Sequence, residues 1–432
     1  MTSIVCKVME SIIRDEIVDF LAQHELLRLS QHGFLRHRST LTNLLEYLEE
    51  LTRMVDNGTA MDVIYLDFSK AFDKVPIRRL LMKCEGLGIR GKVLGWIEEW
   101  LVGRKQRVVI NGKASDWGDI TSGVVQGSVL GPCLFLMYIN DIDKGVEDLD
   151  GFISKFADDS KWARKVMGEE DREVFQQELD QLMGWAEAWQ MDFNKGKCHV
   201  LHLGRNNRRY EYTMGGDKLE PSEAEKDLGV MIHQSLRPSM QCARAAKKGN
   251  SVLGQPLRGV GYRDKKVFID LYKTYVRPQL EYCSTSWCPW TQGDKDVLEA
   301  VQRRAVKAVT NLNSRTYEDR LRELGLDSLE QRRMRGDLIQ TYKVFSGKDN
   351  VKPATWFKMS GPLEGAVTTR RQDSFLNVDT PEWNGEMRRN FWSVRVCDPW
   401  NALPDSVKRA ETTNEFKNSL DNLRGWGKRQ QQ

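Results

Sequence analysis

Residues 65–73 read YLDFSKAFD, and this stretch is the most informative part of the chain. The residues just before Asp67 (Val63 to Leu66) are β-branched, aromatic or aliphatic, which is typical of a buried strand over 61–68. Asp67 then places a carboxylate at the end of that strand. A charge at the tip of so apolar a strand is costly unless a cation meets it. The stretch therefore predicts a strand end that binds positive charge.

A pair of carboxylates, Asp158-Asp159, lies further along the chain in a segment, 152–165, that reads as a hairpin with the pair at its turn. Carboxylates held within a few ångströms repel one another, so that one protonates or a cation binds. Mg²⁺ prefers oxygen ligands and leaves positions open for phosphates, and two such ions can assist an in-line phosphoryl displacement. Asp67, Asp158 and Asp159 together therefore predict nucleotidyl transfer. Taken alone, the Asp-Asp pair indicates only a polar hairpin turn, which is common, and it is Asp67 at a strand end that favours the metal site.

A glycine-spaced segment lies between these carboxylates. Residues 122–132 read SGVVQGSVLGP, with glycines at 123, 127 and 131. Glycine permits close backbone approach and backbone angles that other residues avoid. Gln126 offers both a donor and an acceptor, which suits contacts to a nucleotide. By itself the segment is also consistent with an ordinary loop that opens a helix over 128–140.

Charge divides the chain unevenly. It has 432 residues, of which 40% are hydrophobic and 29% charged, as in ordinary globular proteins. Residues 1–239 are net acidic, at −7, whereas residues 240–348 hold 21 Lys and Arg against 12 Asp and Glu, which gives +9. The basic segment indicates a polyanionic partner, although such residues also solvate helix faces.

The sequence offers no signal for a membrane or an oxidising compartment. No apolar run approaches the roughly 18 residues of a membrane span, and neither a signal-peptide core nor a targeting signal is found. The eight cysteines include no C-x-x-C pair, so we expect reduced thiols and no disulfide-linked partner. We therefore expect an intracellular protein that does not bind membranes.

Apolar periodicity predicts an α+β part followed by a mainly helical part. Helices are expected at 5–29, 41–55, 77–84, 90–103 and 171–191, and strands at 61–68, 106–112, 198–204, 210–214 and 228–232. Beyond these, helical patterns occupy 238–254, 264–280, 294–311 and 326–346. Residues 347–385 are richer in Gly, Pro and Thr, which indicates a connector to a short C-terminal unit.

Three motifs, in this order and spacing, resemble motifs A, B and C of reverse transcriptases: YLDFSKAFD, SGVVQGSVLGP and the FADD of 156–159. Further matching segments are QHGF at 31–34, LFLMYINDI at 134–142, WQMDFNKGKC at 189–198, KDLGV at 226–230, VRPQLEYC at 276–283 and WNALPDSV at 400–407. Over almost its whole length the chain is similar to the polymerase of LINE-type, non-LTR retrotransposons of the jockey and chicken-repeat group.

This resemblance implies a right-hand polymerase fold. Its parts would be partial fingers at 1–60, a palm with an antiparallel sheet at 61–235, a helical thumb with a basic extension at 236–346, a connector at 347–385 and a C-terminal tail unit at 386–432.

The resemblance also implies catalytic roles. Asp67 and Asp158 would bind two Mg²⁺ ions with help from the Phe68 carbonyl, and Asp159 would support the metal cluster. Lys197 matches a lysine that donates a proton to the leaving pyrophosphate. From the residues alone, Lys197 would be interpreted as a solvated surface charge.

Other positions would bind the substrates. Phe72 falls at the steric gate that excludes a ribose 2′-hydroxyl, although a core phenylalanine at a helix start reads the same way. The remaining expected contacts are the dNTP site at Gln126, Gly127 and Arg38, the primer grip at Leu228, Gly229 and Val230, and the nucleic-acid backbone at Arg244, Lys247, Lys248, Lys265, Lys266, Arg303 and Arg304. The backbone contacts would be independent of sequence and would weaken with salt.

The function expected from the resemblance is RNA-directed DNA polymerase: dNTPs are added to a DNA primer on an RNA template, in the cytoplasm and nucleus. Two departures stand out. Val125 replaces the proline of the usual V-P-Q-G, and the finger strands and endonuclease that precede this region in the family are not in the sequence. We therefore expect an N-terminally truncated copy. The alternative function is that of a catalytically silent remnant that still binds nucleic acid.

Overall fold

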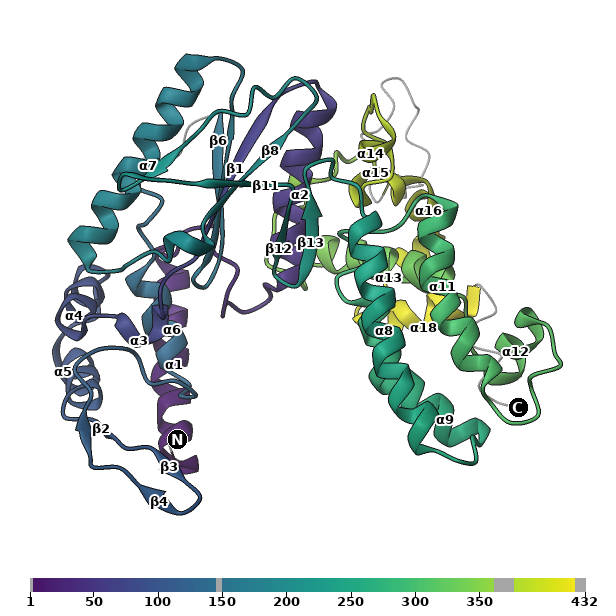
Figure 1. Cartoon of the computed structure of the whole chain (residues 1–432), viewed down its shortest axis with the longest axis horizontal. Coiled ribbons are helices and arrows are strands. Elements are labelled where there is room, and N and C mark those ends of the chain that lie inside the picture. Colours follow the sequence, from purple (N-terminus) through teal and green to yellow (C-terminus); the bar gives the residue numbers. More distant parts are fainter. Residues whose placement is uncertain (1–2, 145–149, 361–376, 424–432) are drawn as a thin grey trace. The chain divides into compact units, whose positions relative to one another are not determined.

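The structure is a computed structural model that describes residues 3–144, 150–360 and 377–423 (Figure 1). The chain divides into two compact units. Unit 1 comprises Met1–Asn43 and Thr59–Glu223, and unit 2 comprises Leu44–Gly58 and Ala224–Gln432. Helix α2 (Thr40–Asp56) begins in the first and continues in the second. The five functional domains expected above have different boundaries and stay predictions.

Unit 1 contains a five-stranded sheet in the order β11-β8-β1-β7-β6. β1 lies at its centre and pairs antiparallel with both β7 and β8, and β11 pairs in parallel with β8. This central place explains the almost unbroken apolar run before Asp67, because a strand covered on both faces has no solvent side to alternate with. The strands are β1 (Met61–Leu66), β6 (Gly151–Phe156), β7 (Asp159–Lys165), β8 (His199–Leu203) and β11 (Glu220–Ser222).

Helices and short strands complete unit 1, and Figure 1 shows α7 beside the sheet. α6 is apolar on all sides and is buried at every residue except Pro132, as expected for a helix without a polar face. The elements are α1 (Ile4–Gln23), α3 (Ala71–Lys74), α4 (Ile77–Gly86), α5 (Gly91–Leu101), α6 (Gly131–Tyr138), α7 (Glu169–Trp189), the 3₁₀ turn η1 (Lys195–Lys197), β2 (Lys105–Gln106), β3 (Val109–Ile110), β4 (Lys113–Ala114), β5 (Gly118–Asp119), β9 (Thr213–Met214) and β10 (Asp217–Lys218).

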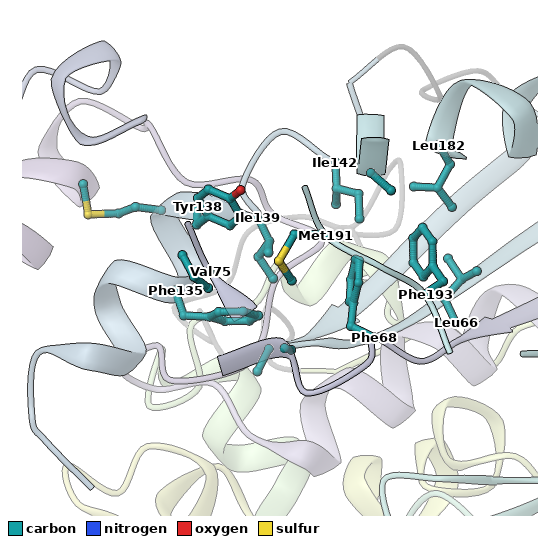
Figure 2. Close-up of a cluster of buried hydrophobic side chains, with 14 of the residues drawn as sticks. Leu66, Phe68, Val75, Phe135, Tyr138, Ile139, Ile142, Leu182, Met191 and Phe193 are labelled. Carbon is teal, nitrogen blue, oxygen red and sulfur yellow. The ribbon is translucent and has the colours of Figure 1, made fainter. Parts of the chain in front are cut away.

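One hydrophobic core joins these elements. Figure 2 shows part of it, with Phe68 and Phe193 side by side next to Leu66. The two rings stack with centroids 4.3 Å apart. The end of β1 therefore rests on packed aromatic side chains, which gives the residues that follow it a rigid base.

Unit 2 begins with a two-stranded hairpin and is otherwise helical. Its elements are β12 (Ala224–Asp227), β13 (Val230–His233), α8 (Ser239–Gly259), α9 (Lys265–Leu271), the π-helical turn η2 (Tyr272–Val276), α10 (Arg277–Glu281), α11 (Gln292–Lys307), α12 (Tyr317–Leu324), α13 (Leu329–Phe345), the 3₁₀ turn η3 (Pro353–Thr355), α14 (Glu386–Arg389), α15 (Trp392–Arg395), α16 (Cys397–Asn401), α17 (Asp405–Lys408) and α18 (Thr413–Leu423). β12 and α12 were not among the expected elements.

The helical segment expected over 264–280 is confirmed, but it is not one regular α-helix. The chain forms α9, then the π-helical turn η2, then α10. Pro278 explains the change, because proline lacks an N–H and clashes with the carbonyl of the preceding turn. A π-turn is one way to accommodate such a defect.

The C-terminal segment is part of the core of unit 2. Trp356 and Trp392 are buried, and their rings meet edge to face with centroids 5.5 Å apart. Arg388 forms a buried ion pair with Glu49 of α2, a carboxyl whose pKa is raised by burial. The expected connector, residues 347–385, therefore contributes the buried side chain of Trp356 to this core. Residues 361–376 of that connector lie outside the described part.

Candidate active site

Asp67 follows directly after the last residue of β1. In the sheet register, Leu66 of β1 faces Ser160 of β7. The backbone at Asp67 is held from the other side, since its carbonyl accepts a hydrogen bond from the Asn194 N–H at 2.7 Å. The side chain of Asp67 is 35% exposed and so remains accessible to a ligand.

The FADD segment forms the tight turn between β6 and β7. Phe156 pairs with Asp159, which leaves Ala157 and Asp158 as the two turn residues. The turn was expected at Asp158-Asp159, but it lies one residue earlier, so that Asp159 is already the first residue of β7. Ala157 has φ +56°, the positive angle that tight hairpin turns require at their first central position.

The sheet register brings the turn and Asp67 to the same edge. Burial raises the pKa of the Asp158 carboxyl above its ordinary value of 3.8, and the negative charge of Asp67 raises it further. The carboxylates of Asp67, directly after β1, and of Asp158, in the β6–β7 turn, therefore repel each other. Asp159 is exposed.

Three features fit a divalent cation at this edge. The two carboxylates repel each other, and a cation would relieve that repulsion. The Lys197 ammonium already lies 3.4 Å from the Asp67 carboxylate, so positive charge is accepted there. Among the hydrogen bonds of the described residues, none ends on the Phe68 carbonyl oxygen, which leaves it available as a ligand. Within that same part of the chain, no three His, Cys, Asp or Glu side chains form a ready metal cluster.

Segment 122–132 packs directly on the backbone that follows Asp67. The N–H groups of Gly123 and Val124 donate to the carbonyls of Val75 and Phe72, both at 2.8 Å. Gly123 has φ +84°, and a Cβ there would come within 2.7 Å of the Asp73 carbonyl oxygen. Glycine is therefore required at 123 both by conformation and by space.

Gln126 is exposed, and its side chain donates a hydrogen bond to the Asp73 carboxylate at 2.8 Å. Asp73 is the last residue of YLDFSKAFD, but we assigned it no role from the sequence. Asp73 belongs to the quoted motif, so the sequence could have drawn attention to it. Its contact with Gln126 is created only by the fold. Gly127, with φ +75°, follows in the same exposed turn.

Phe72 is half-buried and stacks on Phe135 of α6, with ring centroids 4.4 Å apart and planes 16° from parallel. Phe34, the last residue of QHGF, lies edge-on to it at 6.0 Å. The ring of Phe72 therefore has a fixed orientation. A steric gate requires such an orientation, but an ordinary core residue shows it as well, so the role of Phe72 stays a prediction.

Two positions from the N-terminal part hold backbone groups. Arg38 donates to the carbonyls of Leu29 and Gln31, the latter at 2.7 Å, so its guanidinium stabilises the loop before α2. A role for Arg38 in binding dNTP stays a prediction. Glu10, which we did not single out, accepts hydrogen bonds from the Val129 and Leu130 N–H groups at 2.6 and 3.3 Å. It thereby satisfies two backbone donors just before α6.

In unit 2, the expected primer grip is the turn between β12 and β13. Asp227 pairs with Val230, and the turn residues Leu228 and Gly229 have φ +45° and +91°. The hydroxyl of Tyr282 donates to the Leu228 carbonyl at 3.0 Å. Its ring covers Gly229, where a Cβ would come within 3.1 Å of the ring.

The seven expected backbone contacts differ in what surrounds them. Arg244, Lys247 and Lys248 share one exposed face of α8, and none of them forms an ion pair within the described residues. Lys265, by contrast, pairs with Glu323 at 3.0 Å. The others are Lys266, which is exposed, Arg303, which lies over the Tyr317 ring at 5.1 Å, and Arg304, which donates to Asn250 at 3.2 Å.

Two general properties concern the whole described part of the chain. All eight cysteines are free thiols. In the described ranges, no helix combines the length and the apolar character that crossing a membrane requires.

Comparison with known proteins gives a consistent result. The family described as reverse transcriptase (RNA-dependent DNA polymerase) matches residues 1–255. The chain is 24% identical over 314 residues to a probable RNA-directed DNA polymerase from transposon X-element of Drosophila melanogaster, covering 71% of this chain and 34% of that protein. It is 27% identical over 237 residues to the RNA-directed DNA polymerase from mobile element jockey of Drosophila funebris, covering 53% and 26%. The chain thus spans about a third or less of these relatives.

A third relative covers more of the chain. The Pol polyprotein from the type-1 retrotransposable element R2 of Popillia japonica is 25% identical over 400 residues, covering 86% of this chain and 63% of that protein. Among solved structures, telomerase from Candida tropicalis in complex with a fragment of telomeric RNA aligns with 78% of this chain and 50% of its own, at 12% identity and a TM-score of 0.42.

Proposed function

The chain belongs to the reverse transcriptase (RNA-dependent DNA polymerase) family, and from this premise we propose that it is the RNA-directed DNA polymerase of a LINE-type retrotransposon. The observation that supports this most directly is the pair of carboxylates, Asp67 and Asp158, at one edge of the palm-type sheet. In the sheet register, Leu66, the residue before Asp67, faces Ser160, which lies two residues after Asp158, and the charge of Asp67 raises the pKa of Asp158. The partners would be an RNA template, a DNA primer and dNTPs.

In the reaction, the 3′-hydroxyl of the primer loses its proton to solvent water, its oxygen forms a bond to the α-phosphorus of the dNTP, and the bond from that phosphorus to the pyrophosphate oxygen breaks. Asp67 and Asp158, with the Phe68 carbonyl, would hold two Mg²⁺ ions, and Asp159 would support the cluster. When bound, these ions lower the pKa of the attacking hydroxyl and neutralise charge on the phosphates.

The chain's own groups supply the remaining steps. Lys197 lies 3.4 Å from the Asp67 carboxylate, so its ammonium is close to the metal edge and would donate a proton to the leaving pyrophosphate. Gln126 and Gly127 would bind the dNTP, and Arg38 would contact its triphosphate. Phe72 would contact the sugar of the dNTP as the steric gate. In unit 2, Leu228, Gly229 and Val230 would hold the primer, while Arg244, Lys247, Lys248, Lys265, Lys266, Arg303 and Arg304 would bind phosphates.

Primer extension on an RNA template with Mg²⁺ tests this function. We expect incorporation by the full chain and a loss of about 10³-fold or more in Asp158→Ala, because the ion's contribution is worth several kcal/mol. The matched control is Asp119→Ala, which removes a carboxylate that is 75% exposed on β5. Equal incorporation by wild type and Asp158→Ala would contradict the assignment. No incorporation with retained, salt-sensitive RNA binding would favour the silent remnant.

The selectivity between dNTP and NTP tests the role of Phe72 as the steric gate in a separate experiment. Phe72→Ala removes the ring that stacks on Phe135, and we expect the preference for dNTP over NTP to fall about tenfold to 100-fold. The ratio of kcat/KM values for dTTP and UTP on the same template measures this. An unchanged ratio would assign Phe72 to the core instead, and a wild-type preference for UTP would contradict DNA synthesis.

A further inference from the structure

The Asp158 turn is held by a side chain from outside the sheet. Gln31, the first residue of QHGF, is 3% exposed, and its side-chain oxygen accepts hydrogen bonds from the Gly33 and Ala157 N–H groups at 2.7 and 2.8 Å. Its amide nitrogen donates back to the Ala157 carbonyl at 3.4 Å. Both polar groups of Ala157, the residue before Asp158, therefore bond to one side chain.

The backbone around Gln31 reinforces this grip. Gln31 forms a parallel bridge with Lys155 at the open edge of β6, in which the Lys155 N–H donates to Ser30 and the His32 N–H to Lys155, both at 2.9 Å. The Asn43 side chain also donates to the Lys155 carbonyl at 3.0 Å. The strand leading into the turn is thus paired on the side where β6 would otherwise end the sheet.

Two further features limit movement of the turn. The Lys155 ammonium is fully buried and pairs with the Asp143 carboxylate at 2.9 Å. This ion pair fixes the end of β6 to the segment that follows α6. Gly33 touches the turn itself, since a Cβ at that position would lie 2.4 Å from the Ala157 nitrogen. Segment 31–33 therefore matches the shape of the turn as well as its hydrogen bonds.

Ala157 needs this support because its φ of +56° is a conformation that L-residues rarely adopt. Asp158 is joined directly to that peptide, so the direction of its carboxylate depends on it. We propose that Gln31 is a positioning residue for Asp158, and that it sets the metal affinity of the site and the rate of the chemical step without contacting the dNTP. This inference rests on the proposed function of Asp158 as a metal ligand.

Two variants disturb the turn from different sides. Gln31→Met keeps the size of the side chain and removes all three hydrogen bonds, whereas Gly33→Ala keeps them and adds a clash with Ala157. The control is Gln340→Met, which has the same substitution at a side chain 5% exposed that donates to Asp349 at 2.7 Å in unit 2. It reports the cost of losing a buried glutamine hydrogen bond away from the site.

The test uses the full chain and Mn²⁺ alone as the probe, with binding followed by electron paramagnetic resonance and incorporation by primer extension. We expect Gln31→Met and Gly33→Ala each to raise the Mn²⁺ Kd and lower kcat by about tenfold, with an unchanged KM for dNTP. Gln340→Met should lower the melting temperature of the protein about as much as Gln31→Met does. It should leave the Mn²⁺ Kd unchanged.

Each outcome decides between positioning and general stability. Wild-type Mn²⁺ affinity and kcat in Gln31→Met would overturn the inference, as would an equal rise of the Mn²⁺ Kd in Gln340→Met. The wild-type protein could bind Mn²⁺ more tightly than Asp158→Ala and yet incorporate no dNTP. This result would contradict the proposed function but not the role of Gln31. The Kd comparison would then still decide the role of Gln31.

Discussion

At the scale of the residue, Asp158 combines partial burial with a like charge beside it, and both raise the pKa of its carboxyl. A group whose pKa is raised by folding contributes stability only while it is protonated. That contribution is complete below its unfolded value of 3.8 and is lost as the pH rises through the higher folded value. Above that folded value, the ionised Asp158 of the metal-free protein therefore opposes folding.

We predict that Asp158→Asn stabilises the metal-free protein at pH 7. The amide keeps the shape of the side chain and removes the charge, so the melting temperature in EDTA should rise, and the gain should shrink as the pH falls toward 3.8. Added Mg²⁺ should stabilise wild type and have little effect on the variant. Thermal unfolding at several pH values measures both effects. A variant that is less stable than wild type in EDTA would contradict this account.

The Asp73–Gln126 contact leads to a second prediction at this scale. Asp73→Ala removes the acceptor for the Gln126 amide, which lies 2.8 Å away, and should raise the KM for dNTP about two- to tenfold. Asp73→Asn keeps a side-chain oxygen and should stay close to wild type. Steady-state kinetics separate the two variants. Equal effects of Ala and Asn would assign the change to lost charge.

At the scale of the element, the β12–β13 turn depends on a helix-end tyrosine. Leu228 adopts φ +45°, which is unfavourable for a side chain of its size, and the Tyr282 hydroxyl bonds to its carbonyl. Tyr282 lies just beyond α10, within the VRPQLEYC segment. The position of the turn is therefore set by a contact that no pattern within KDLGV reveals.

We expect Tyr282→Phe to weaken binding of a primer–template duplex about two- to tenfold, because it removes one hydrogen bond and keeps the ring over Gly229. Tyr282→Ala should weaken binding further, since it also uncovers the glycine. Fluorescence anisotropy with a labelled duplex gives the Kd values. Wild-type affinity in both variants would remove the turn from the list of primer contacts.

The expected elements were most accurate where apolar spacing alone decides them. α7 spans Glu169–Trp189 against an expected 171–191, and α8 begins at Ser239 as expected from 238. Errors arose where local geometry overrides spacing, as at the π-turn before Pro278 and at the FADD turn, which lies one residue early. A proline or a two-residue turn shifts hydrogen bonding without changing the apolar pattern.

At the scale of the whole molecule, the excess of positive charge over 240–348 predicts salt-sensitive binding of nucleic acid. Not all of these charges are available, because Lys265 is paired with Glu323 and Arg304 contacts Asn250. The face of α8 that bears Arg244, Lys247 and Lys248 carries no such partner within the described residues. We therefore expect this face to contribute most of the phosphate contacts.

Replacing Arg244, Lys247 and Lys248 with Gln should reduce the slope of log Kd against log salt by about two for RNA, at roughly 0.7 to 0.9 per contact. Lys265→Gln with Arg304→Gln should change the slope by less than about one, since these side chains already have partners. Binding measured from low to moderate salt tests both variants. A larger change in the second variant would place the binding face elsewhere.

The sequence by itself predicted the proposed chemistry and determined the strands that carry Asp67 and Asp158. An apolar strand ending in Asp67, and a second strand end at Asp158, follow from side-chain spacing and hydrophobicity, which act over neighbouring residues. Only the tertiary structure decided that Gln31 supports Asp158, that Asp73 meets Gln126 and that Arg388 neutralises Glu49. Such pairs join residues far apart in the chain, and their partners are chosen by the packing of whole elements, which no local pattern encodes.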